Sequence, residues 1–147
     1  MDLYGTHQEA LAWAAAQIDK GPVLEVGAGW WSTPWLHGFC EATDRLLLTL
    51  ESHSVWLMGI APLFANDRHR FVSDVPDMDF ALALVDGGDP DRARYVRALN
   101  GRCQFLICHD TEESSRYNYP EMEQSLAEWP NRRDFQRLWP HTTVVWS

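Results

Sequence analysis

The chain has 147 residues, of which 46% are hydrophobic, and this is enough for one compact domain with a sizeable core. We therefore expect a single domain over residues 1–147. Twelve basic residues against 21 acidic ones give a net charge of -9, which would repel the phosphates of a nucleic acid. The charge balance thus argues against a nucleic-acid partner.

The cysteines and the apolar segments bear on the compartment. Cys40, Cys103 and Cys108 are at spacings that match neither a zinc site nor a disulfide framework. No segment approaches the roughly 20 apolar residues that span a bilayer, and the first residues lack a basic region followed by an apolar stretch. These features predict a soluble cytoplasmic protein with no membrane association.

Apolar periodicity and capping residues predict the first elements. An alanine-rich segment with helical spacing predicts a helix over residues 6–18, with Thr6 as its N-cap. An apolar run between two glycines predicts a strand over residues 22–26 that is buried on both faces. Ser32 as a hydroxyl cap and Pro34 at the first helical position predict the start of the next helix.

The later elements continue this alternation. We expect strands over residues 45–50, 70–73, 80–85 and 104–108, helices over residues 53–64, 91–99 and 121–129, a polar loop over residues 111–119, and a closing strand pair over residues 133–138 and 142–146. Alternating strands and helices predict a mostly parallel sheet covered by helices on both faces. Ligands of such sheets bind beyond the carboxyl ends of the strands.

A glycine turn follows the first predicted strand. Gly27 and Gly29 lack a Cβ, so the chain can turn sharply there and a ligand can approach the backbone. Two glycines also make an ordinary tight turn, so this pair alone is weak evidence. Glu25 puts a negative charge beside the turn, which disfavours a pyrophosphate and favours a ligand with an amino group and a sulfonium.

Acidic residues recur where the other strands end, at Glu51, Asp74, Asp86 and the pair His109–Asp110. Any one of them can be a helix cap or a turn former, but their shared edge predicts a ligand site. Glu51 is placed to accept hydrogen bonds from the two hydroxyls of a ribose. A ribose site without a pyrophosphate site suggests S-adenosylmethionine.

With these motifs the chain resembles the class I S-adenosylmethionine-dependent methyltransferases over residues 23–146. The resemblance is based on residues 23–29, Glu51 and residues 84–88. The resemblance implies an α/β fold with a Rossmann-like seven-stranded sheet, mostly parallel with a C-terminal antiparallel strand pair and helices on both faces. It implies that Glu25 and the glycine turn hold the methionine end of the cofactor, Glu51 the ribose and Asp74 the adenine amino group. The full set of implied cofactor-binding residues is Glu25, Gly27, Gly29, Trp30, Glu51, Ser52, Asp74 and Asp86. Trp31 stands where the family has a third glycine.

Residues 85–89 and 107–111 are similar to a branch of O-methyltransferases with an Asp-Gly turn after strand four and a His-Asp pair after strand five. This similarity implies a hydroxyl of a small molecule as the methyl acceptor. It implies His109, Asp110 and Asp86 as catalytic residues, with His109 the first candidate for the base. Some members hold a divalent cation, and Asp86 and Asp110 are hard oxygen ligands for Mg²⁺, with Asp89 as a third.

Three functions are left open at this point: a methyltransferase, a non-catalytic S-adenosylmethionine-binding regulator or partner subunit, and a nicotinamide-dependent oxidoreductase. Glu25 and the absence of a third glycine disfavour the oxidoreductase. The chain has only one helix before its first strand and no added cap, which predicts an open site. An open site fits a large substrate or a homodimer in which a neighbour supplies the missing wall.

Overall fold

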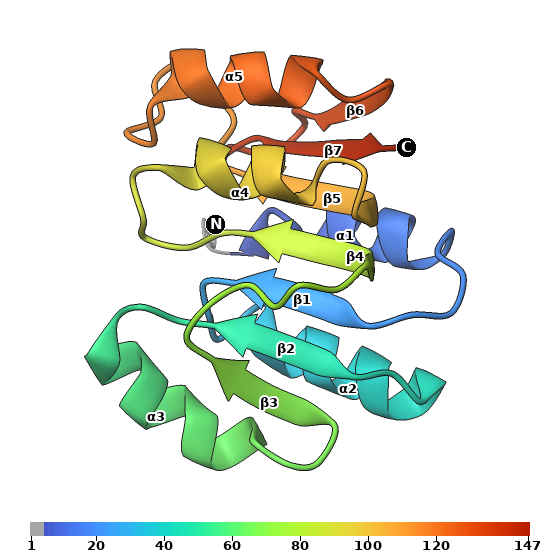
Figure 1. Cartoon of the computed structure of the whole chain (residues 1–147). Coiled ribbons are helices and arrows are strands. Elements are labelled where there is room, and N and C mark those ends of the chain that lie inside the picture. The colour runs from blue at the N-terminus through green and yellow to red at the C-terminus, as the bar shows by residue number, and fades with distance from the viewer. Residues whose placement is uncertain (1–4) are drawn as a thin grey trace.

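The structure is a computed structural model, which describes residues 5–147. The start of the chain, where the sequence predicts no export signal, lies partly outside this range. The described residues form one seven-stranded sheet of order β3-β2-β1-β4-β5-β7-β6, shown in Figure 1. The strands are β1 (Val23–Val26), β2 (Leu47–Leu50), β3 (His69–Val72), β4 (Phe80–Val85), β5 (Cys103–His109), β6 (Asn131–Phe135) and β7 (Thr142–Trp146). The first five are parallel, and β7 runs antiparallel to β5 and β6.

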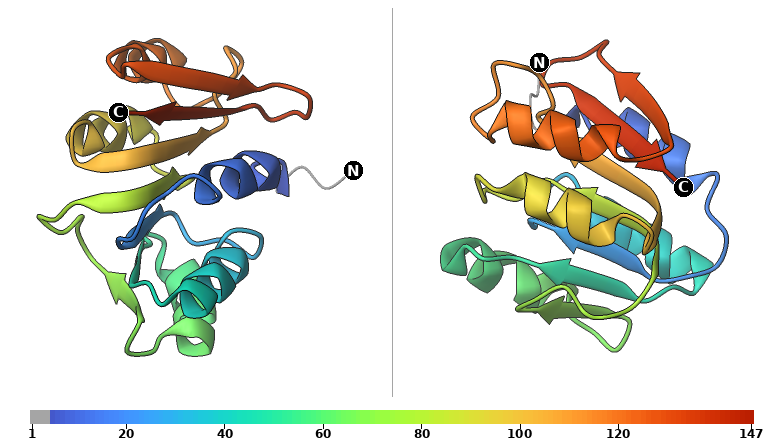
Figure 2. Two further views of the ribbon diagram at one scale, coloured as in Figure 1. Left: turned by 90° about the vertical axis from the view of Figure 1, so that its right-hand side faces the viewer. Right: turned by 45° about the horizontal axis from the view of Figure 1, so that its top comes forward.

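Helices cover both faces of this sheet. They are α1 (Gln8–Ala15), α2 (Thr33–Thr43), α3 (Ser54–Phe64), α4 (Arg92–Leu99) and α5 (Tyr119–Ala127). Figure 2 shows α1 and α2 on one side of the sheet and α4 and α5 on the other. The predicted Rossmann-like α/β fold is therefore confirmed. Between residues 5 and 147, no helix is long and apolar enough to cross a membrane.

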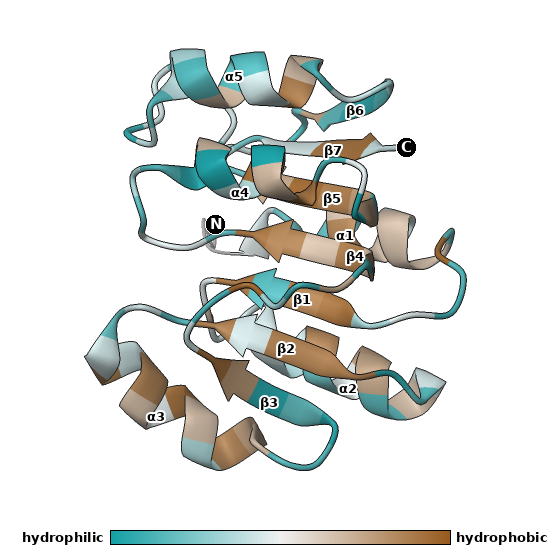
Figure 3. Ribbon diagram, in the orientation of Figure 1, coloured by the Kyte–Doolittle hydropathy of each residue, from teal (hydrophilic) through white to brown (hydrophobic). Residues whose placement is uncertain are grey.

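Alternate strand residues supply two separate cores. Val23 and Leu82 pack with α1 and α2, whereas Leu24 and Ala83 pack with α4 and α5. The central strands β1 and β4 are buried along their whole length, because helices cover both of their faces. Figure 3 shows the resulting hydrophobic centre of the sheet. The carboxyl ends of β1, β4 and β5 consequently lie next to one another.

The capping hydrogen bonds predicted at Thr6 and Ser32 do not form, although Ser32 does occupy the N-cap position of α2. Helix α1 begins at Gln8 with His7 in the N-cap position, and the hydroxyl of Thr6 donates to the carbonyl oxygen of Pro140 instead. Ser32 does precede α2, but its hydroxyl donates to a carboxylate oxygen of Glu25 and makes no cap. In both cases the hydroxyl donates to an acceptor elsewhere in the fold and not to the backbone of the helix.

Candidate functional site

The glycine turn packs directly on the turn that follows β4. Gly27 has a φ of +93°, and a Cβ built on it would lie 2.2 Å from the Cα of Gly87. A side chain is thus excluded both by conformation and by space. Asp86, which precedes Gly87, is held beside the glycine turn by this backbone contact. The two predicted motifs therefore meet in one place.

Glu25 lies beneath the turn with its side chain fully buried. Its carboxylate accepts hydrogen bonds from the hydroxyls of Ser32 (2.6 Å), Thr33 (2.9 Å) and Thr49 (2.8 Å). Burial raises the pKa of Glu25 from 4.5 to about 7, although these three hydroxyls oppose the shift. The hydroxyl of Thr33 also accepts the amide of Gly29 (3.0 Å), so Glu25 shapes the turn through Thr33.

A series of hydrogen bonds leads from Glu25 through Thr49 to two histidines, His69 and His37. The hydroxyl of Thr49 lies 2.9 Å from Nε2 of His69, and Nδ1 of His69 lies 3.0 Å from Nδ1 of His37. Because Thr49 donates to Glu25, Nε2 of His69 carries a proton and Nδ1 accepts from His37. Burial lowers the pKa of His69 to about 4, in keeping with a neutral ring. No pattern in the sequence predicted this series of hydrogen bonds.

Glu51 connects the end of β2 to the glycine turn. One carboxylate oxygen accepts the amide of Ala28 (2.8 Å) and the other accepts the amide of His53 (2.6 Å). Ser52 and Asp74 are exposed near the ends of β2 and β3. The structure thus joins Glu51 to the turn and leaves Ser52 and Asp74 at the edge of the site.

Trp30 lines a cleft between the glycine turn and α3. The cleft has a volume of about 240 Å³ and is lined by Trp30, Val55, Trp56, Gly59 and Ile60. Half of the Trp30 side chain is exposed. A cleft of about 280 Å³ lies at the opposite edge of the sheet, where Gly21, Phe80 and Cys103 mark the amino ends of the strands. Because its lining includes none of the predicted site residues, we assign no function to it.

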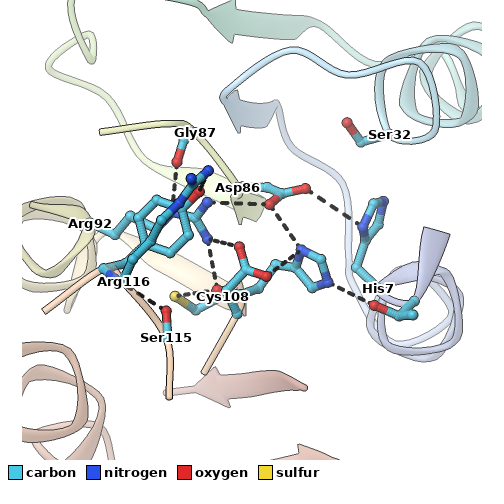
Figure 4. A network of polar contacts seen from close by, with 12 residues as sticks. His7, Ser32, Asp86, Gly87, Arg92, Cys108, Ser115 and Arg116 are labelled. Carbon is cyan, nitrogen blue, oxygen red and sulfur yellow. Dashed lines mark hydrogen bonds and ion pairs between the residues drawn. The ribbon is translucent and has the colours of Figure 1, made fainter. Parts of the chain in front are cut away.

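Asp86 and His109 form the centre of a polar network at the ends of β4 and β5, shown in Figure 4. Nδ1 of His109 lies 2.9 Å from Oδ1 of Asp86, and Nε2 lies 2.8 Å from the hydroxyl of Thr6. Burial acts to lower the pKa of His109, but the hydrogen bond and charge of Asp86 outweigh it and raise the pKa. Both ring nitrogens of His109 therefore already have partners.

Arg92 is a site residue that the sequence analysis missed. Its buried guanidinium donates to the carbonyl oxygens of Gly87 (2.7 Å) and His109 (2.8 Å). It lies 3.0 Å from Oδ2 of Asp110 and 3.6 Å from Oδ1 of Asp86, and it stacks 3.5 Å from the ring centre of Tyr117. A signal for it exists, because position 92 shares the helical stripe of the buried Val96 and Leu99.

Asp110 forms an ion pair with Arg92. Its backbone has a φ of +55°, and its carboxyl faces the guanidinium of Arg92. Burial raises the pKa of Asp110 despite the opposing charges of His109 and Arg92. Asp110 and Asp86 therefore share one arginine between them.

His7 is a second residue that the sequence analysis missed. Its side chain is 1% exposed, and neither ring nitrogen has a hydrogen-bond partner among residues 5–147. Nδ1 lies 3.6 Å from Oδ2 of Asp86, and the ring packs edge-on against His109 with centroids 5.1 Å apart. Burial lowers the pKa of His7 to about 4. A single histidine in an alanine-rich helix carried no signal of this contact.

Asp86, Asp89 and Asp110, predicted for Mg²⁺, do not together form a group with metal-ligand spacing among the described residues. Asp110 pairs with Arg92, and Asp89 pairs with Arg94 at the surface. Among the residues that the structure describes, the one group with metal-ligand spacing consists of His7, Asp86 and His109, whose ligand atoms all lie within 4.8 Å of one another. Asp86 belongs to this group and Asp110 does not.

Comparisons with known proteins give likenesses at the level of structure. No family model matches the chain, and no curated protein matches its sequence. Similar solved structures include an S-adenosylmethionine-dependent O-methyltransferase from Thermotoga maritima, with 11% identity and a TM-score of 0.66 over 95% of this chain and 64% of that one. A spermidine synthase in complex with the transition state analogue AdoDATO has 12% identity and a TM-score of 0.66 over 99% and 61%. The human methyltransferase 10 domain containing protein has 12% identity and a TM-score of 0.59 over 100% and 84%.

The chain spans less than two thirds of the length of the first two of these proteins. At such identities the likeness establishes the fold. The sheet order and its antiparallel end agree with that fold strand by strand. The chain therefore has the fold of the class I S-adenosylmethionine-dependent methyltransferases.

Proposed function

We propose that the protein is an S-adenosylmethionine-dependent methyltransferase that methylates a hydroxyl group of a small molecule. The backbone contact between Gly27 and Gly87 is the main support for this proposal. It brings the turn after β1 next to the turn after β4. The first turn offers glycine backbone and a nearby carboxylate, Glu51, to a cofactor. The second turn offers Asp86, with His109 beside it, to an acceptor.

For the cofactor, we assign the ribose to Glu51. A carboxylate has about four sites that accept hydrogen bonds. The amides of Ala28 and His53 use two of them, which leaves acceptor capacity for the two ribose hydroxyls. Ser52 and Asp74 stay assigned to the ribose and adenine edge, and Trp30 to the wall of the apolar cleft.

The methionine end of the cofactor is assigned to the turn itself, with Gly27 and Gly29 allowing close approach to the backbone. Glu25 acts here indirectly. Its carboxylate is satisfied by three hydroxyls, and one of them, from Thr33, fixes the amide of Gly29. We therefore propose Glu25 as the residue that sets the shape of the turn.

For the acceptor, we assign Asp86, Asp110 and His109. The sulfonium already activates the methyl group and leaves as a neutral thioether, so the protein chiefly aligns the reacting atoms. The side chains of Asp86 and Asp110 are 19% and 18% exposed and can reach a hydroxyl. The buried His109 holds Asp86 in place from behind.

Calorimetry with S-adenosylmethionine tests the cofactor assignment. We expect wild type to bind and Glu51→Gln to bind at least tenfold more weakly, about 1.4 kcal/mol, because a carboxamide has no charge and only one acceptor oxygen. Glu128→Gln, an exposed change at the end of α5, is the matched control and should bind like wild type. Absence of binding by wild type would sink the proposal.

A non-catalytic S-adenosylmethionine-binding protein is the second candidate. The observation that favours it is that both ring nitrogens of His109 are occupied, so the histidine has none free to take a proton from an acceptor. A panel of phenols, catechols and sugars, incubated with the cofactor and analysed by mass spectrometry, separates the two candidates. Methylated product supports the enzyme, and cofactor binding without any product supports the regulator.

A further inference from the structure

Three side chains from distant parts of the sequence converge at one edge of the sheet. His7 comes from the start of α1, Asp86 from the end of β4 and His109 from the end of β5. Figure 4 shows the His7 ring beside the Asp86 carboxylate, and the ring of His109 packs edge-on against that of His7. One ligand atom from each of the three lies within 4.8 Å of the others.

The hydrogen bonds around His109 fix which of its nitrogens carries a proton. The hydroxyl of Thr6 donates its one hydrogen to the carbonyl oxygen of Pro140, at 3.0 Å. It must then accept from Nε2 of His109, at 2.8 Å. The imidazolium would donate a proton from Nδ1 to Oδ1 of Asp86, 2.9 Å away, whereas the neutral ring leaves Nδ1 bare there. Two acceptors at this distance need a proton or a cation between them.

His7 adds an independent observation. A buried polar group without a hydrogen bond costs free energy, and such groups are rare in folded proteins. The ring of His7 is 1% exposed, and within the described part of the chain both of its nitrogens lack a hydrogen-bond partner. Nδ1 nevertheless lies 3.6 Å from Oδ2 of Asp86, the carboxylate whose other oxygen faces His109. Nδ1 of His7 could coordinate a cation bound beside Asp86.

The spacing of these atoms suits a transition metal. Bonds of about 2.0–2.2 Å to nitrogen and oxygen put neighbouring ligand atoms about 2.8–3.6 Å apart in octahedral and tetrahedral sites. The two measured separations, 2.9 Å from His109 to Asp86 and 3.6 Å from His7 to Asp86, match this range. Two imidazoles and one carboxylate select a divalent ion such as zinc or iron(II) over magnesium.

We propose that His7, Asp86 and His109 bind one divalent first-row transition metal ion. Thr6 and Pro140 orient His109 from behind, as outer partners of metal-bound histidines do. The partial exposure of Asp86 leaves an edge at which water or a ligand oxygen completes the coordination. Metal binding needs neither cofactor nor acceptor, so it goes beyond the proposed function. A role for the ion in polarising the acceptor oxygen would rest on that function.

Titration of the tag-free, metal-stripped protein with Co²⁺ tests the site, because cobalt d–d absorption reports binding and coordination. We expect one Co²⁺ per chain, displaced by Zn²⁺. His7→Phe keeps the ring and removes the nitrogens, and Asp86→Asn keeps the size and removes the charge. Each should weaken Co²⁺ binding at least tenfold. Far-ultraviolet circular dichroism of each variant verifies folding, so that a loss of Co²⁺ binding is read only from folded protein.

Two controls give the test its specificity. His37→Phe removes a histidine from the close pair with His69 and should leave the cobalt spectrum unchanged. Asp110→Asn alters the other acidic residue of the site at a backbone φ of +55°, which asparagine tolerates, and should retain binding. Absence of Co²⁺ binding by wild type, or an unchanged affinity in both His7→Phe and Asp86→Asn, would overturn the proposal. Calorimetry with S-adenosylmethionine on the same samples reports separately on the proposed function.

Discussion

Charge compensation at the site depends on one buried side chain, Arg92. Its guanidinium lies 3.0 Å from Asp110 and 3.6 Å from Asp86, and its side chain is almost fully buried. Removal of one partner from a buried ion pair leaves an uncompensated charge, which costs about 3–5 kcal/mol. We therefore expect Arg92→Met to lower the free energy of unfolding in urea by about that amount.

The control for this prediction is Arg94, which has the same side chain as Arg92 and lies two positions further along α4 but is exposed. Arg94 pairs with Asp89 at the surface, so Arg94→Met should unfold at the same urea concentration as wild type. Equal stabilities of Arg92→Met and wild type would show that Arg92 does not carry the compensation.

The raised pKa of Glu25 predicts a particular dependence of stability on pH. The carboxyl loses its proton at about pH 7 in the folded chain and at about 4.5 in the unfolded chain. Between these values the folded state binds more protons, so stability falls as the pH rises through this window and is constant above it. The shift corresponds to about 3 kcal/mol. Glu25→Gln, which cannot titrate, should lose that part of the slope.

Urea unfolding of both proteins at several pH values between 4 and 8 measures the difference. The quantity of interest is the slope, because the amide also changes the hydrogen bonds with Ser32, Thr33 and Thr49 at every pH. Parallel pH profiles of wild type and Glu25→Gln would contradict the assignment.

Individual site residues were predictable to different degrees. Glu51 and Asp86 follow their strands directly, so the pattern of strand ends was enough to place them at the site edge. His7 is 79 positions from Asp86, and their contact exists only because α1 packs against β4 and β5. Arg92 was hidden by its arginine-rich helix, whose other charges are solvated. Long-range packing, which no local pattern encodes, brought His7 to the site, whereas the position of Arg92 on the buried stripe of α4 was a local signal.

Among elements, the two turns at the ends of β1 and β4 depend on each other. An alanine at position 27 would combine a strained φ with a clash against the backbone of Gly87, and these costs add to about 2–5 kcal/mol. We expect Gly27→Ala to lower stability by this amount. Thermal or urea unfolding measures it.

Gly38→Ala is the matched control. Gly38 lies inside α2 with nothing near its would-be Cβ, so alanine should stabilise the helix by about 0.5–1 kcal/mol. If both alanines had the same effect, the contact between the turns would not be what requires a glycine at position 27.

The order and type of the elements followed from the sequence because nearly every strand is apolar and every helix is amphipathic or alanine-rich. The exception is β6, predicted over residues 133–138 and found at Asn131–Phe135. Four of its five residues are polar and exposed, so no alternation marked its bounds. Its register comes from pairing with β7, where Asn131 lies opposite Trp146.

At the scale of the whole molecule, the sheet order explains why the site lies where it does. Neighbouring parallel strands β1, β4 and β5 bring the glycine turn, Asp86 and His109 to one edge. Strand alternation predicted this gathering, and the fold confirmed it. The apolar face of α3 was not anticipated: Val55, Met58 and Leu63 are all more than 60% exposed.

The polarity of β6 has a consequence for solubility. This strand forms one outer edge of the sheet, where free backbone amides and carbonyls invite another chain to add a strand. Arg132 forms ion pairs with Glu123 and Asp134, and Arg133 lies over the ring of Trp13. A second chain that paired there would have to strip water from these charges. The same residues that concealed the strand thus protect the protein against aggregation.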